Sequence, residues 1–70
     1  MAYSPDVLLK VVELGGNLEI YQSLSPQALE KIITAAKETG SKVKIKGKYS
    51  PNVIYHLVSI GGNNVTIICE

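Results

Sequence analysis

The dipeptide Ser-Pro occurs three times in this chain of 70 residues, beginning at Ser4, Ser25 and Ser50. Each serine stands directly before a segment with apolar residues at helical spacing. Serine is a strong helix N-cap, because its side-chain oxygen accepts a hydrogen bond from a free backbone N–H of the first turn. Proline suits the first helical position, where its fixed φ helps and its missing N–H has no cost. Three copies of this signal predict three helices that begin in the same way.

Apolar residues around each serine strengthen this prediction. One stands just before each serine and another four positions after it, which is the spacing of a hydrophobic staple. The pairs are Tyr3 and Leu8, Leu24 and Leu29, and Tyr49 and Ile54. Each helix then has an apolar stripe at the period of an α-helix. The stripes are Val7, Leu8, Val11, Val12 and Leu14; Ala28, Leu29, Ile32, Ile33, Ala35 and Ala36; and Val53, Ile54, Leu57, Val58 and Ile60. The glycines at 15–16, 40 and 61–62 are expected to end these helices as left-handed caps.

A short alternating segment follows each glycine position: 18–20, 43–45 and 65–67. An apolar, polar, apolar order is typical of a half-buried strand. The chain is therefore expected to form one domain, residues 1–70, with three helix–strand units at 4–24, 25–49 and 50–70. Successive strand–helix–strand connections are right-handed and place parallel strands side by side. The expected fold class is α/β, with a three-stranded parallel sheet in the order 1-2-3, all helices on one face, and a solenoid-like character.

The segment LEIYQSLSPQALEKIITAAKETGSKVKIKGKYSP, from Leu18 to Pro51, carries a family resemblance. It resembles a leucine-rich repeat of the ribonuclease-inhibitor type, which has a short L-x-L strand, a turn and a capped helix. The segment covers the central half of the chain. Either distant relationship or convergence explains the resemblance. It implies that the strand face binds protein and that the chain carries out no catalysis.

The composition gives no evidence for an enzyme, a metal site or a cofactor. Cys69 is the only cysteine and His56 the only histidine, so neither a disulfide within the chain nor a cysteine–histidine metal cluster can form. His56 is expected on a solvated helix face and Cys69 as a buried structural thiol. The net charge is only +1, and no apolar run reaches the roughly 20 residues that cross a bilayer. Because the start lacks the features of a signal peptide, we expect a cytoplasmic protein without membrane contact.

The expected bare face of the sheet carries a row of alternating lysines. The residues expected on this partner-binding face are Glu19, Tyr21, Lys42, Lys44, Lys46, Lys48, Thr66 and Ile68. One interpretation is an anionic partner, either an acidic protein patch or a phosphate backbone. The other is a solvated face on which Glu19 pairs with Lys44. A small nucleic-acid-binding protein is the alternative function, but the chain has no arginine and few aromatic residues near the lysines, which argues against it.

The third strand is expected to be an open edge without charge. The residues of this expected oligomer edge are Val65, Thr66, Ile67, Ile68 and Cys69. Uncharged, β-branched edge strands pair readily with a second chain. A homo-oligomer is therefore expected, and a closed dimer is favoured over a fibre. The sequence thus predicts a non-enzymatic protein-interaction module that self-associates through its sheet edge and binds partners on its strand face.

Overall fold

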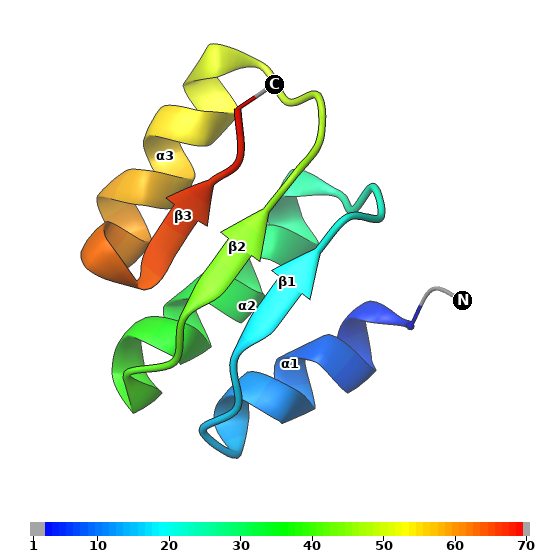
Figure 1. The fold of residues 1–70 in the computed structure, drawn as a ribbon, viewed down its shortest axis with the longest axis vertical. Coiled ribbons are helices and arrows are strands. Elements are labelled where there is room, and N and C mark those ends of the chain that lie inside the picture. Colours follow the sequence, from blue (N-terminus) through cyan, green and yellow to red (C-terminus); the bar gives the residue numbers. More distant parts are fainter. Residues whose placement is uncertain (1–2, 70) are drawn as a thin grey trace.

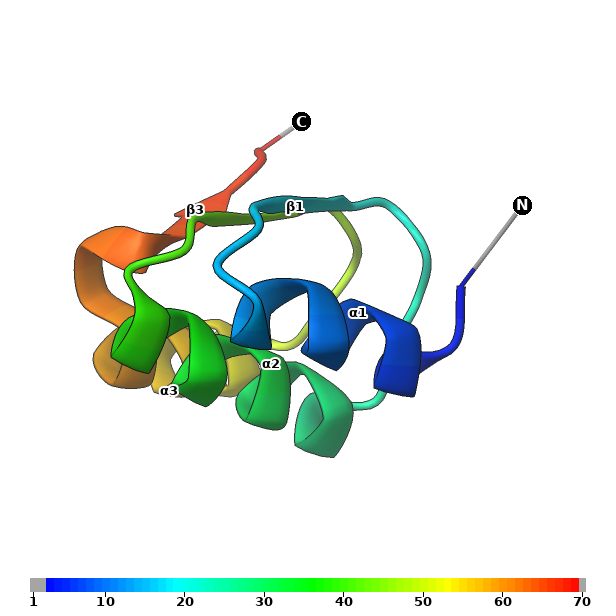
Figure 2. The ribbon, with the colours of Figure 1, turned by 90° about the horizontal axis from the view of Figure 1, so that it is seen from below.

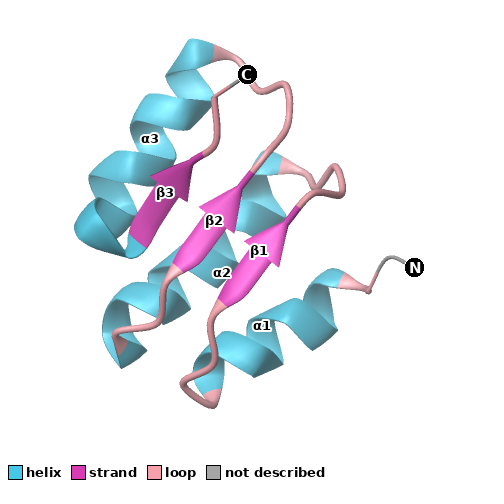
Figure 3. Ribbon diagram, in the orientation of Figure 1, coloured by secondary structure: helices cyan, strands magenta, loops and turns pink. Residues whose placement is uncertain are grey.

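A computed structural model describes residues 3–69 and shows three helices alternating with three strands (Figures 1 and 3). The α-helices are α1 (Pro5–Glu13), α2 (Pro26–Thr39) and α3 (Pro51–Gly61). The strands are β1 (Leu18–Ile20), β2 (Val43–Ile45) and β3 (Val65–Ile67), and a 3-10 turn, η1 (Gly62–Asn64), joins α3 to β3. The predicted order of three helices and three strands is therefore confirmed.

The three strands form one open parallel sheet in the order β1-β2-β3, as predicted. Lys44 of β2 stands beside Glu19 of β1 and Thr66 of β3, so the polar middle residues form a row across the sheet. Figure 2 shows all three helices in one layer on the same side of the sheet. Figure 1 shows that α1 and α3 lie outside the two edge strands, whereas α2 lies under the sheet. No helix within residues 3–69 lies over the other side of the sheet.

The three helices begin as the Ser-Pro signals predict. The hydroxyl oxygens of Ser4, Ser25 and Ser50 accept hydrogen bonds from the backbone N–H three residues later, at 3.4, 3.2 and 3.3 Å. Each serine has extended backbone angles, and proline occupies the first helical turn. These caps satisfy N–H groups that the first helical turn leaves without a partner.

The helix ends confirm the predicted glycine caps in two units and correct the prediction in the third. Gly15 and Gly40 have φ values of 90° and 81°, in the left-handed region that glycine adopts without strain. In the third unit, Gly61 is still part of α3, with φ −92°, and Gly62 is the residue with positive φ. Gly61 is buried where α3 approaches β3 and α2. Its small size, rather than a left-handed turn, is what this position requires.

The core lies between the sheet and the helix layer and consists of aliphatic side chains. The fully buried members include Val12, Leu29, Ile32, Ile33, Ala36, Val43, Ile45 and Leu57. A small polar cluster joins the three units at the start of the strands. The Thr39 hydroxyl donates to the Val12 carbonyl at 2.9 Å and lies 3.0 Å from the hydroxyl of buried Ser41. The Asn64 side-chain amide donates to the Ser41 carbonyl at 2.9 Å, so the third unit also contributes to this cluster.

Several apolar residues of the predicted helix stripes are exposed. Leu14 is 76% exposed, Val7 45% and Val58 39%. Val7 lies on α1 and Val58 on α3, which are the outer helices of the layer, and Leu14 is the C-cap of α1. An outer helix has a neighbouring helix on one side only, so one flank of its apolar stripe stays in solvent.

Candidate functional site

The bare face of the sheet, which we call the lysine face, is built around the row Glu19, Lys44 and Thr66. These three side chains are exposed, because they alternate with residues that point into the core. Lys44 Nζ lies 3.9 Å from Glu19 Oε2, and both side chains are a little over half exposed. The cross-strand pair expected between these residues is thus present. Exposed pairs of this kind are weak, contributing at most about 1 kcal/mol, so Lys44 can exchange this partner for another carboxylate.

Tyr21 connects Glu19 of this row to Lys46. Its hydroxyl donates a hydrogen bond to Glu19 Oε1 at 2.9 Å. This bond, and the negative charge of Glu19, raise the pKa of Tyr21 above its ordinary value of 10.0. Lys46 Nζ lies 5.7 Å from the centre of the Tyr21 ring, within the range of a cation–π contact. The structure therefore brings Glu19, Tyr21, Lys44 and Lys46 into one connected cluster.

The remaining lysines extend the positive charge beyond the strands. Lys42 lies just before β2, where its backbone N–H donates to Asn17 Oδ1 at 2.8 Å. Lys48 lies in the loop after β2 and is exposed, whereas Lys46 is only partly exposed. Because β2 ends at Ile45, only Lys44 of the four lysines lies within a strand. The lysines therefore follow β2 and its two flanking loops rather than one long strand.

Charge is divided unequally between the two sides of the molecule. The lysine face and its flanking loops have four lysines and one glutamate, whereas the helices have three lysines and four acidic residues. Residues 49–69, which include α3 and β3, contain no aspartate, glutamate, lysine or arginine. The positive charge thus follows the middle strand, whereas the third unit consists almost entirely of apolar and uncharged polar residues.

Three of the five residues of the expected oligomer edge, Val65, Thr66 and Ile67, form β3, whereas Ile68 and Cys69 follow it. The Ile68 backbone N–H donates to the Ile45 carbonyl at 2.9 Å, so pairing with β2 continues one residue beyond β3. Backbone groups alternate in direction along a strand, so those of Ile67 point away from β2 to the open edge. Val65 is buried, Ile67 and Ile68 are partly buried and Thr66 is exposed.

Cys69 corrects a prediction, because its thiol is exposed rather than buried. The prediction assumed that strand alternation continues to Cys69, whereas the last backbone bond of this segment to β2 is made by Ile68. A pocket lies beside this end of β3, between it and the first turns of α3. It is lined by Gly47, Lys48, Tyr49, Ile54, Ile67, Ile68 and Cys69.

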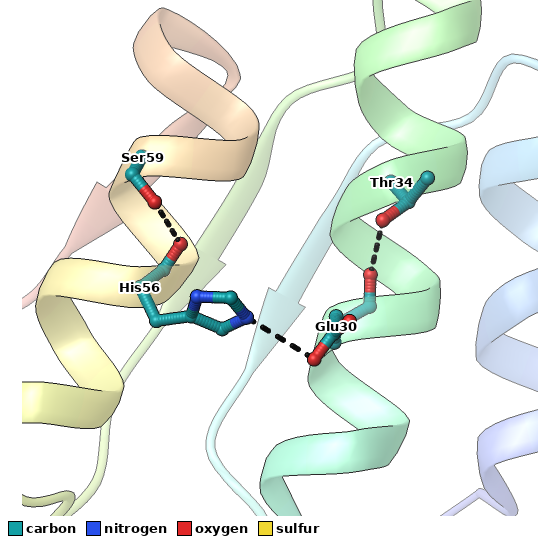
Figure 4. Close-up of polar contacts among 4 residues, drawn as sticks. All are labelled: Glu30, Thr34, His56 and Ser59. Carbon is teal, nitrogen blue, oxygen red and sulfur yellow. Dashed lines mark hydrogen bonds and ion pairs between the residues drawn. The ribbon is translucent and has the colours of Figure 1, made fainter.

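The helix side contains a contact that the sequence analysis did not identify. His56 Nε2 of α3 lies 3.2 Å from Glu30 Oε2 of α2, and both side chains are about half exposed (Figure 4). The hydroxyls of Ser59 and Thr34 donate to the carbonyls of His56 and Glu30, each at 2.7 Å. His56 is on the surface, as predicted, and it marks the flank of α3 that faces α2. Within residues 3–69, no group of three or more His, Cys, Asp or Glu side chains is placed to hold a metal ion.

These features define an α/β protein with an open parallel sheet, one bare charged face and an uncharged edge. No protein-family model matches the chain, and neither a curated protein nor a solved structure is detectably similar to it. None of the helices between residues 3 and 69 combines the length and the apolar character needed to cross a membrane.

Proposed function

We propose that this chain is a non-enzymatic protein-interaction module of solenoid-like, leucine-rich-repeat-like character. It self-associates through the β3 edge and binds an acidic protein partner on the lysine face. The observation that carries the proposal is the combination of a sheet open on one face and an uncharged edge strand. In repeat proteins of the α/β type, an open strand face of this kind serves as a binding surface.

Self-association follows from the edge. In the part of the chain that the structure describes, no further strand lies beside the outward backbone groups of β3, and Ile68 and the pocket next to it present apolar surface. A second chain that pairs with this edge satisfies those groups and removes the apolar surface from water. Ile68→Lys should therefore weaken association and leave the fold intact. Ile67→Lys should instead destabilise the fold, because Ile67 packs against the core.

Sedimentation equilibrium tests this part of the proposal. The wild type should sediment as an oligomer at micromolar to millimolar concentrations, with little dependence on salt, and Ile68→Lys as a folded monomer. A wild type that is monomeric throughout this range contradicts self-association. If the two lysine variants affect folding equally, the assignment of Ile67 to the core side and of Ile68 to the edge is wrong.

Partner binding on the lysine face is tested with charge reversals. Lys44→Glu combined with Lys46→Glu should keep cooperative unfolding but abolish binding to an acidic polypeptide such as polyglutamate. The control reverses two lysines on the helix side, Lys10→Glu with Lys31→Glu, which changes net charge equally and should reduce binding much less. Tighter binding to single-stranded DNA than to polyglutamate, with a steep fall as salt rises, would support the alternative nucleic-acid function instead.

A further inference from the structure

The two ends of the helix layer expose apolar residues at repeat positions that are less exposed in the other two units. The eighth residue after each serine is Val12, Ile33 or Val58. Val12 and Ile33 are 0% exposed, because each lies on a helix that the next helix covers. Val58 is 39% exposed, because no helix follows α3 within the described residues. The outer flank of α3 is therefore equivalent to flanks that α2 and α3 cover within the molecule.

The opposite end shows the complementary pattern. The tenth residue after each serine is Leu14, Ala35 or Ile60, and only Leu14, at 76%, is largely exposed. The third residue after each serine repeats this pattern. Val7 is 45% exposed, whereas Ala28 and Val53 are partly buried.

Helix geometry shows that these residues face outward along the layer. His56 faces α2 through its contact with Glu30, and Val58 is two residues further, about 200° around the helix. Val58 therefore points away from α2. On α1, Leu9 lines a groove shared with α2, and Val7, two residues earlier, points away by the same reasoning. We call the surface around Val58 and β3 the α3 end, and the surface around Val7, Leu14 and β1 the α1 end.

We infer that the α3 end binds the α1 end of a second copy of this chain, so that copies stack end to end as the units stack within each molecule. The inference rests on the proposed self-association and specifies its geometry. The contact continues an interface that the molecule already contains twice, between α1 and α2 and between α2 and α3. It places β3 of one copy beside β1 of the next, in the same parallel arrangement as β1-β2-β3.

Charge and apolar surface favour this arrangement. Continuing the register places Thr66 beside Glu19 of the next copy, so the row across the sheet becomes Glu19, Lys44, Thr66 and Glu19 again without adjacent like charges. The uncharged third unit meets a flank that presents Val7 and Leu14.

Complementation between two variants tests the geometry. Val58→Lys should block the α3 end, Leu14→Lys should block the α1 end, and both positions are exposed enough to keep the fold. Each variant alone should sediment as one chain, with association weakened at least about 10-fold. An equimolar mixture should form a dimer and no larger species, because each partner supplies one intact end. Thr34→Lys, which adds the same charge to the central helix, should associate like the wild type.

Other outcomes overturn the inference in distinct ways. A dimer formed by Leu14→Lys alone, with Val58→Lys monomeric, shows a symmetric contact between two α3 ends. Two monomeric variants that do not complement each other also contradict the end-to-end contact, while an oligomeric wild type still supports self-association. Circular dichroism confirms folding. Tyr55 is 69% exposed on α3 and lies three residues, about one helical turn, before Val58, so Val7→Lys with Tyr55→Lys provides a second pair if either variant unfolds. A monomeric wild type removes both the proposed self-association and this inference.

Discussion

Substitution of Gly61 by alanine should destabilise the fold, although alanine is the better helix former. Gly61 is the last residue of α3 and is buried. A Cβ atom at this position would overlap Val65 Cγ2 of β3 and lie 2.6 Å from Ile33 Cγ2 of α2. Carbon atoms in contact are normally about 3.5–4.0 Å apart, so α3 or the side chains of Val65 and Ile33 must move by about 1 Å or more.

The size of the effect follows from two opposing contributions. Alanine in place of glycine inside a helix stabilises by up to about 1 kcal/mol. Overpacking of a core costs about 1–3 kcal/mol, and here the added methyl meets side chains of two other elements at once. We expect a net loss of about 2 kcal/mol from a total of roughly 4–10 kcal/mol for a domain of this size. The melting temperature should fall by about 8–16 °C.

Urea unfolding at one fixed protein concentration measures this loss, and a double-mutant cycle identifies its cause. Val65→Ala removes the nearest methyl group, so the double variant Gly61→Ala with Val65→Ala should be more stable than the sum of the single losses predicts, by about 1 kcal/mol. Strictly additive losses, or a Gly61→Ala variant as stable as the wild type, would refute the close-approach argument.

Three further predictions concern single side chains. In a spectrophotometric titration, the phenol of Tyr21 should ionise with a pKa above 10.0, and Glu19→Gln should bring that pKa back towards 10.0. Because the pKa is raised in the folded state, the contact of Tyr21 with Glu19 stabilises the fold below about pH 10. This stabilisation is lost as pH rises through the raised pKa. Tyr21→Phe identifies the titrating group, and an unchanged curve in Glu19→Gln would contradict the assignment. The exposed Cys69 thiol should react with a thiol reagent in the folded monomer about as fast as in urea. A much slower reaction in the folded monomer would show that the thiol is buried. Ser41→Ala should lower the free energy of unfolding by about 1 kcal/mol, because it removes hydrogen bonds from a buried polar cluster. A loss below about 0.3 kcal/mol would show that Thr39 alone satisfies the Val12 carbonyl.

The architecture was predictable because its determinants are local. A serine cap and a proline act within one turn, and alternation in 43–45 defines a strand without knowledge of its neighbours. Three repeats of the same signals then leave few possible topologies. The lysine face could be predicted for the same reason, since Glu19 and Lys44 occupy the same place in their units.

Other features depend on contacts between distant segments. The segments Gly15-Gly16 and Gly61-Gly62 look alike in sequence, but only Gly61 lies against β3 and α2. Ser41 is buried through contacts with Thr39 and with the Val12 carbonyl, 29 residues away. Periodicity also predicts an apolar stripe without showing whether a neighbour covers each flank, so the exposure of Leu14 and Val58 became apparent only from the structure.

The position of α1 and α3 outside the edge strands has a consequence for any larger array. Neighbouring helices pack about 8–10 Å apart, whereas neighbouring strands lie only about 4.7–4.9 Å apart. A stack of such units therefore bends, with the helices on the outer circumference and the strands on the inner one. The lysines that follow β2 in each copy then converge on the concave rim, although each chain carries a net charge of only +1. If the lysine face binds an acidic partner as proposed, an acidic polypeptide long enough to follow that rim would gain contacts with every copy added, and its affinity should rise with the length of the arc.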